Sequence, residues 1–171
     1  LSGESSEAVV DYGRCVIFLD VDGVLHAAHG ALEPFDADCM ENLADIWRET
    51  KAEIVLSSAW RLMEKGAGRR AVDQALVRHG MPRTASVTPA TAGLPGRADE
   101  IRAWLMQTHG SLNAVRWVVL DDMDMTEELG PHMLLTDAED GLTEDDVETA
   151  LEILATPGCH SLRYSALYRF N

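Results

Sequence analysis

The sequence of 171 residues is poor in cysteine and contains no long apolar run. Its three cysteines, Cys15, Cys39 and Cys159, have no spacing typical of a metal site and cannot all pair, so we expect free thiols and a cytoplasmic location. No segment approaches the roughly 20 apolar residues needed to cross a bilayer, which argues against a membrane partner. Residues 1–10 lack the basic start and apolar core of a signal peptide, and we interpret them as a flexible segment outside the fold.

Lysine and arginine are also scarce, and the formal net charge is −15. Between Trp117 and Leu162 there are 13 acidic residues and no lysine or arginine. Such a surface repels phosphate backbones, so passive electrostatic binding to nucleic acid is disfavoured. One basic cluster stands against this trend and predicts a local anion site: Arg61, Lys65, Arg69 and Arg70.

The stretch from Cys15 to Leu25 is an apolar run interrupted by two carboxylates and a glycine. Its first part has no polar face, which predicts a buried strand. Asp20, Asp22 and Gly23 then fall at the carboxyl end of that strand, where open α/β sheets bind ligands. An ordinary turn is the alternative interpretation, since Asp and Gly are common turn residues.

Two further apolar strands also end in polar pairs. They are residues 53–58, which end in Ser57 and Ser58, and residues 115–120, followed by Asp121 and Asp122. Because crossovers between parallel strands are right-handed, such ends gather at one edge of a sheet. Three polar strand ends in one chain favour a functional site over three unrelated turns.

Helical patterns separate these strands. Asp36 is a capping residue for a helix that runs to about Thr50, and Thr143 with the acids after it starts another that runs to about Ala155. The other predicted elements are helices at 69–79 and 97–109 and weaker strands at 85–88 and 132–136. This alternation predicts an α/β fold, a three-layer Rossmann-like sandwich with a mainly parallel central sheet. The intervals between strands leave no room for a large cap domain.

Carboxylates that converge without histidine or cysteine partners favour a hard cation. Mg²⁺ fits, because it takes few carboxylates together with phosphate oxygens. Asp20 would then attack phosphorus, while Asp22 would protonate the leaving oxygen and later activate water. Gly23 would bring backbone N–H groups toward the phosphate, and Ser57 would donate a hydrogen bond to it. Arg97, at a predicted helix start, is the candidate cation for the developing charge.

These motifs resemble the haloacid dehalogenase (HAD) superfamily of phosphohydrolases. Val16–Leu25 is similar to its first motif, Ile54–Ser57 to its second and Val118–Asp122 to its fourth. The resemblance covers roughly residues 15–155. It implies a single HAD-like phosphatase domain, which we place at residues 11–171.

The resemblance also implies roles for the site residues. Asp20 would be the nucleophile, Asp22 the general acid and base, and Ser57 a phosphate ligand. Mg²⁺ would be held by Asp20, the backbone carbonyl of Asp22 and Asp121, with Asp122 close to the metal.

The third motif departs from the family pattern, which usually has a lysine there. Arg97 stands at the corresponding position, and Lys65 is the alternative. Arginine keeps the charge but presents a planar fork, which alters the geometry offered to a phosphate. Three residues are further candidate substrate contacts: Gly23, Ser58 and Arg61.

The segments 56–61 and 96–105 are similar to the phosphatase-type domains of bacterial RNA-repair proteins. An uncapped site suits a phosphorylated nucleic-acid end, and a small phosphate ester is the alternative substrate. A non-catalytic HAD-fold partner or regulatory module is a competing hypothesis, because Arg97 replaces the usual lysine and the surface is strongly acidic.

Three ring-bearing residues near these motifs have other interpretations. Trp60 follows the second motif and fits either core packing or stacking on substrate. His26 and His29 lie just after the first motif, and we interpret them as solvated loop residues rather than substrate contacts.

Overall fold

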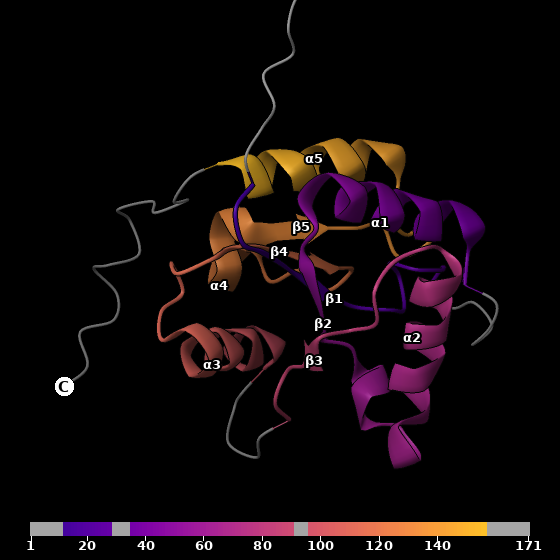
Figure 1. Cartoon of the computed structure of the whole chain (residues 1–171), viewed down its shortest axis with the longest axis horizontal. Helices are drawn as coiled ribbons and strands as arrows, with labels where there is room; N and C mark the ends of the chain where they lie inside the picture. Colours follow the sequence, from indigo (N-terminus) through magenta and orange to yellow (C-terminus); the bar gives the residue numbers. More distant parts are fainter. Residues whose placement is uncertain (1–11, 29–34, 91–95, 157–171) are drawn as a thin grey trace, which may run out of the picture.

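A five-stranded parallel sheet forms the centre of the computed structural model (Figure 1). The structure describes residues 12–28, 35–90 and 96–156. The strand order is β3-β2-β1-β4-β5, and every neighbouring pair is parallel. The bounds of the strands are β1 Cys15–Leu19, β2 Glu53–Leu56, β3 Ser86–Val87, β4 Arg116–Asp121 and β5 Met133–Leu135.

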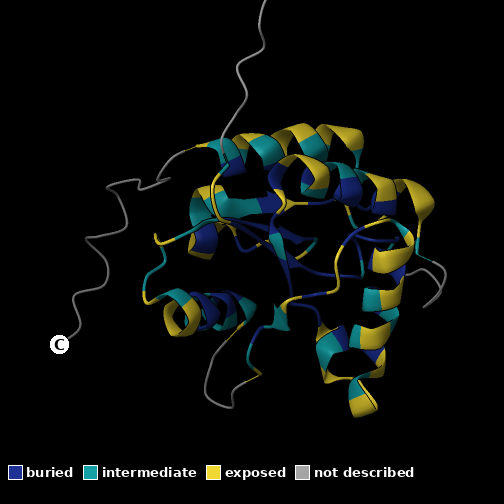
Figure 2. Cartoon of the chain, in the orientation of Figure 1, coloured by how far each residue is buried: buried dark blue, intermediate teal, exposed yellow. Residues whose placement is uncertain are grey.

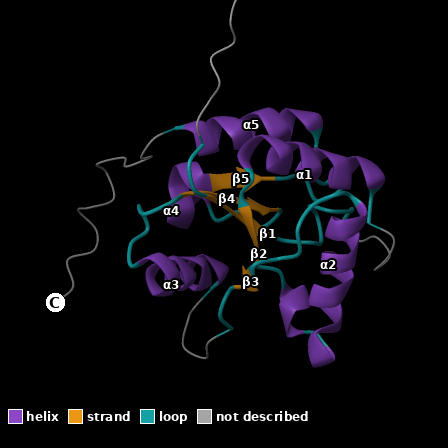
Figure 3. Ribbon diagram, in the orientation of Figure 1, coloured by secondary structure: helices purple, strands orange, loops and turns teal. Residues whose placement is uncertain are grey.

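Helices cover both faces of this sheet, because the side chains of β1 alternate between two apolar clusters. Ile17 and Leu19 pack in a cluster with α1, α2 and α5, whereas Val16 and Phe18 pack in a cluster with α3 and α4. The layers are visible in Figure 3, where the strands lie between the helices. The helix bounds are α1 Ala37–Thr50, α2 Ala67–Arg78, α3 Arg97–His109, α4 Thr126–Leu129 and α5 Glu144–Ala155.

The sheet interior is apolar on both sides, which Figure 2 shows as dark strands beneath helices with exposed outer faces. All five residues of β1 are buried, and Ile17, Phe18 and Leu19 have no exposed surface. The polar residues that follow such a strand are therefore held in place by a packed apolar core. The expected three-layer Rossmann-like sandwich is confirmed.

Capping residues set the helix starts where the sequence predicted them. The Asp36 side chain accepts hydrogen bonds from the backbone N–H groups of Asp38 and Cys39, and α1 follows. Thr143 and Asp146 form a capping box at α5, with each side chain bonded to the other residue's backbone N–H. The predicted span 97–109 coincides with α3.

Several boundaries differ from the sequence-based expectation. Two short 3-10 helices, η1 (Ala59–Leu62) and η2 (Glu64–Gly66), follow β2, and α2 begins at Ala67 rather than near residue 69. The single-turn helix α4 and the 3-10 helix η3 (Gly130–His132) were not predicted, because single turns are too short to show a periodic pattern.

The described residues between β1 and α1 form turns and loops, and those between β2 and α3 form η1, η2, α2, β3 and loops, with no large cap domain. Within the same residues, no helix combines the length and hydrophobicity of a membrane span. Cys39 is a buried free thiol, and burial raises its pKa to about 11. Cys159 and the segment 1–10 lie outside the described residues.

Candidate active site

The ends of the three central strands bring the predicted site residues into one row. Leu19 is in register with Leu56 of β2 and with Leu120 of β4, so the residues that follow lie side by side. The row is Ser57, Asp20 and Asp121. Backbone hydrogen bonds continue the sheet to this level, from the Ser57 N–H to the Leu19 carbonyl (2.8 Å) and from the Asp20 N–H to the Leu120 carbonyl (3.0 Å).

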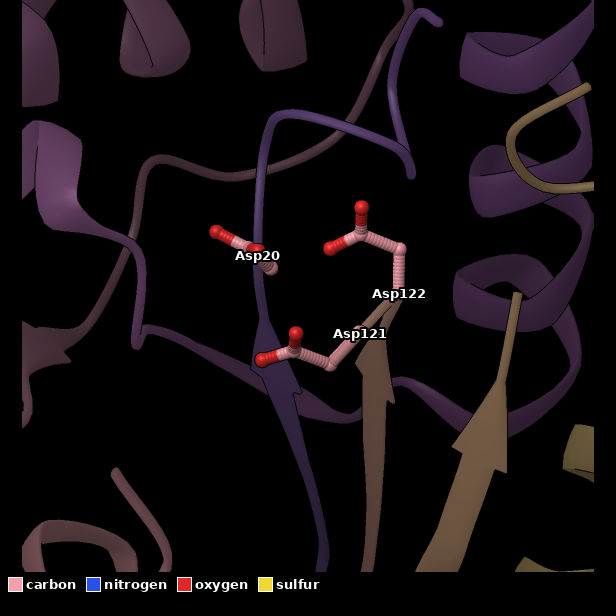
Figure 4. A group of neighbouring side chains, drawn as sticks. All are labelled: Asp20, Asp121 and Asp122. Carbon is pink, nitrogen blue, oxygen red and sulfur yellow. The ribbon is translucent and has the colours of Figure 1, made fainter. Parts of the chain in front are cut away.

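Three carboxylates meet at this edge (Figure 4). One oxygen from each of Asp20, Asp121 and Asp122 lies within 4.8 Å of the others. Asp20 and Asp121 are buried, and Asp122 is partly exposed. Burial and the charge of Asp20 raise the pKa of Asp121 to about 6, and the same two causes raise the pKa of Asp122. The site concentrates more negative charge than its surroundings readily hold.

Arg97 is the cation at the centre of this cluster. Its Nη1 donates to Asp20 Oδ2 (2.8 Å) and to Asp121 Oδ2 (2.5 Å). Burial alone would lower the pKa of Arg97, but the charges of Asp20 and Asp121 outweigh that effect and raise it. As the first residue of α3, Arg97 reaches the row from the helical layer that packs on Phe18. The alternative cation, Lys65, is exposed on η2.

The two serines after β2 have different surroundings. Ser57 is fully buried, and its Oγ has no hydrogen-bond partner among the residues that the structure describes. An unpaired buried hydroxyl costs free energy, which a phosphate oxygen could recover by accepting its hydrogen bond. Ser58 is also buried, but its Oγ accepts a hydrogen bond from the backbone N–H of Trp60. Ser58 thus caps η1, and its contact with substrate stays a prediction.

Arg61 was a candidate substrate contact, and its guanidinium is instead held by the protein. It donates to the backbone carbonyls of Ser57, Ser58 and Thr88, at 2.8–3.2 Å, and it pairs with Glu100 Oε2 at 2.5 Å. Only 5% of its side chain is exposed. Arg61 therefore ties the loop after β2 to α3, and its contact with substrate stays a prediction.

The basic cluster around Arg61 is also dispersed. Arg69 donates to the hydroxyl and the carbonyl of Thr84, and the Arg70 guanidinium bonds the Lys65 carbonyl. These contacts stabilise the turns at the two ends of α2. The cluster does not form one anion site among the described residues.

Asp22 has partners that the sequence did not reveal. The indole N–H of Trp60 donates to Asp22 Oδ2 (3.0 Å), and His26 Nε2 lies 3.1 Å from Asp22 Oδ1. His26 Nδ1 donates to the carbonyl of Ala27 at 2.8 Å. His26 is only 5% exposed, so its interpretation as a solvated residue was wrong, and His29 lies outside the described residues. Trp60, 3% exposed, is a core residue with one polar contact.

Gly23 occupies a position that a side chain cannot share. Its φ is +72°, and a Cβ there would lie 2.4 Å from Asp122 Oδ2. The hydroxyl of Thr136 donates to the Gly23 carbonyl at 2.6 Å and so fixes this turn to the end of β5. The turn brings the Gly23 backbone against Asp122, and the Gly23 N–H donates to the His26 carbonyl at 2.9 Å. The contact of this turn with a phosphate stays a prediction.

A family model described as the HAD domain in Swiss Army Knife RNA repair proteins matches residues 16–147. The chain belongs to this family. The match extends from β1 into α5 and includes Asp20, Ser57, Arg97 and Asp121. No curated protein and no solved structure matches the chain. Membership in the HAD family supports a phosphatase-type function, which the acidic cluster at the strand ends accommodates.

Proposed function

We propose that this HAD domain is a Mg²⁺-dependent phosphomonoesterase that works through an aspartyl-phosphate on Asp20. The observation that carries the proposal is the row at the sheet edge, in which a carboxylate nucleophile lies between a buried hydroxyl and a second carboxylate. Ser57, Asp20 and Asp121 come from three neighbouring strands. Arg97 adds a cation from the helix above them.

The residues at this edge fit a divalent cation. Three carboxylates gather within 4.8 Å, while Arg97 contacts only Asp20 and Asp121. Burial, and after it the charge of Asp20, raises the pKa values of Asp121 and Asp122, and a bound cation would oppose both effects. Asp20, Asp121 and the backbone carbonyl of Asp22 would hold Mg²⁺, with Asp122 beside them. When bound, the ion would neutralise charge on the carboxylates and on the phosphate.

In the first step, a carboxylate oxygen of Asp20 attacks phosphorus, and the bond from phosphorus to the ester oxygen breaks. The electron pair of that bond goes to the leaving oxygen, which takes a proton from the Asp22 carboxyl group. Ser57 donates its free hydroxyl hydrogen to a phosphoryl oxygen, and Arg97 stabilises the charge that develops there.

In the second step, Asp22 is a carboxylate and acts as a base. It takes a proton from a water molecule, whose oxygen attacks phosphorus and breaks the bond to Asp20. Inorganic phosphate leaves, and both aspartates return to their starting forms. Each role needs Asp22 close to the phosphate, and its charge does contribute to the raised pKa of Asp122 beside the row.

The substrate class follows from access to the site and from the family. The described residues form no large cap domain, which suits a substrate larger than a free metabolite. The family is that of HAD domains in RNA repair proteins. We propose a terminal phosphate of a nucleic acid as the substrate, recognised mainly at the phosphate, because Arg61 is held by the protein and the chain carries a net charge of −15.

Replacement of the nucleophile tests the reaction. Asp20→Asn is expected to reduce hydrolysis of p-nitrophenyl phosphate in Mg²⁺ to background, because an amide oxygen is a poor nucleophile. Asp45→Asn is the matched control, since Asp45 lies on α1 with its side chain half exposed, and it should keep wild-type activity. Chelator should stop the wild-type enzyme. Full activity in Asp20→Asn would exclude the mechanism, and an inactive wild type would favour the non-catalytic module.

A substrate comparison tests the class. The kcat/KM for oligonucleotides with a 5′- or 3′-terminal phosphate is measured against that for mononucleotides and glycerol phosphate. We expect a higher value for the oligonucleotides. Equal or lower values would indicate a small phosphate ester as the substrate.

A further inference from the structure

The Asp22 carboxyl group is held from its buried side by two aromatic residues. Trp60 donates its indole N–H to Oδ2 at 3.0 Å, and His26 lies at Oδ1. The Asp22 side chain is 42% exposed, so its other edge faces outward from the loop after β1. Without these contacts, a half-exposed carboxyl group would rotate among several orientations.

Trp60 itself has little freedom to move. Its ring packs against Phe35 and His26, with ring centroids 5.5 and 6.1 Å away. The backbone N–H of Trp60 is capped by Ser58. Its carbonyl lies so close to Gly68 that a Cβ there would come within 2.2 Å of the oxygen. The indole N–H is therefore presented from a fixed backbone and a packed ring.

We infer that Trp60 is a positioning residue that aligns the Asp22 carboxyl group for proton transfer to the leaving oxygen. The inference rests on the proposed function, in which Asp22 is the acid. An indole N–H is always a donor, so it holds Oδ2 as an acceptor and sets the orientation of the carboxyl group. The N–H holds the carboxyl group without placing a charge beside it.

This role sets which phosphate esters depend on Trp60. A strongly basic leaving group, such as the alkoxide of a sugar or glycerol, needs a proton as its bond to phosphorus breaks. A weakly basic one, such as p-nitrophenolate, leaves without it. Positioning by Trp60 therefore matters for alkyl phosphates, which include nucleic-acid ends, and matters little for activated aryl phosphates.

The test compares kcat/KM for two esters in Trp60→Phe, because this constant reports the first phosphoryl transfer. Phenylalanine keeps an aromatic ring but removes the donor. Since aligned acid catalysis is worth about 10²- to 10⁴-fold, we expect a loss of about tenfold with glycerol 2-phosphate. With p-nitrophenyl phosphate we expect a change of less than about twofold, by the same reasoning.

Trp117→Phe is the matched control. Trp117 is also buried, 4% exposed, and its indole N–H also donates one hydrogen bond at 3.0 Å, to the Leu112 carbonyl. It lies in β4 at the end away from the site, in register with Val16. It should lose some thermal stability and should keep the wild-type ratio of the two constants.

Two outcomes overturn the inference without touching the proposed function: an equal loss with both esters, which marks a structural role, or no loss with either. A wild type that hydrolyses neither ester instead refutes the proposed function. If Trp60→Phe does not fold, β-(3-benzothienyl)alanine at position 60 replaces the N–H by sulfur in the same shape. The same selective loss with glycerol 2-phosphate is expected from it.

Discussion

The two sides of the site hold their carboxylates by different means. Asp20 and Asp121 share the guanidinium of Arg97, whereas Asp22 is held by the neutral indole of Trp60. A cation favours the ionised form of a neighbouring carboxylate, which a nucleophile requires. A neutral donor fixes the orientation of a carboxyl group and still allows it to carry a proton. Two aspartates that are two residues apart thus lie in environments suited to different tasks.

Burial sharpens the difference. The side chains on the Arg97 side are almost fully enclosed, with 14% of Arg97, 6% of Asp20 and none of Asp121 exposed. Charges in such a place interact strongly but lose hydration. Asp22 remains 42% exposed, so solvent can exchange protons with it. Mutation on the enclosed side is therefore expected to change stability as well as catalysis, and mutation on the open side mainly catalysis.

Removal of the shared cation should have the largest effect. Arg97→Met leaves two enclosed carboxylates without a partner, and we expect the free energy of unfolding in metal-free buffer to fall by about 4 kcal/mol. Chemical denaturation measures it. Arg102→Met, on the same helix with an ion pair to Asp99 at 3.2 Å, is the control and should cost less than about 1 kcal/mol. Equal losses in the two variants would contradict the central role of Arg97.

A side chain at Gly23 should have the next largest effect. Gly23→Ala meets both a positive φ of +72° and contact with Asp122, so we expect a loss of about 3 kcal/mol and weaker Mg²⁺ binding. Gly80→Ala is matched in backbone conformation, with φ +76° and open space at the Cβ position. It should cost about 1 kcal/mol and leave Mg²⁺ affinity unchanged. Calorimetry follows both; identical losses of affinity would rule out the contact with Asp122 as the cause.

The pH dependence of stability should show the smallest effect. The folded protein holds a proton on Asp121 up to a pKa of about 6, whereas an ordinary Asp releases it near 3.8. Protonation therefore favours the folded state below that window, and stability falls as pH rises through it. Without metal, we expect a loss of at most about 3 kcal/mol across the window relative to Asp121→Asn, which cannot titrate. A difference that stays constant with pH would contradict the raised pKa.

Local sequence was sufficient for the strands and helices that position the row. The apolar run before Asp20 predicted β1, Asp36 and Thr143 predicted the starts of α1 and α5, and the span of α3 was predicted to the residue. Each of these signals lies within one turn or one strand. Local backbone preferences and apolar periodicity therefore determined these elements. The parallel direction of the strands followed from the alternation of strands and helices.

The partners of the side chains required the tertiary structure. Arg61 and Arg97 both lie close to a motif in the sequence. Both were therefore candidates for contact with the substrate phosphate. In the structure, Arg61 bonds to Glu100, 39 residues away, and Arg97 bonds to Asp20, 77 residues away. Local spacing carries no information about pairs that lie so far apart in the chain. The position of Trp60 directly after the second motif indicated that it lies near the site. Its hydrogen bond to Asp22 joins residues 38 positions apart, and so the sequence did not reveal it.

The sequence by itself determined which residues end the buried strands, because apolar runs and their polar ends are local features of the chain. It thereby determined that carboxylates and a hydroxyl meet at one edge of a parallel sheet. Only the tertiary structure decided how each is held: Asp20 by a cation, Asp22 by an indole, and Ser57 with its hydroxyl free. Those contacts depend on how α3 and η1 pack over the strand ends, and packing is a property of the whole fold.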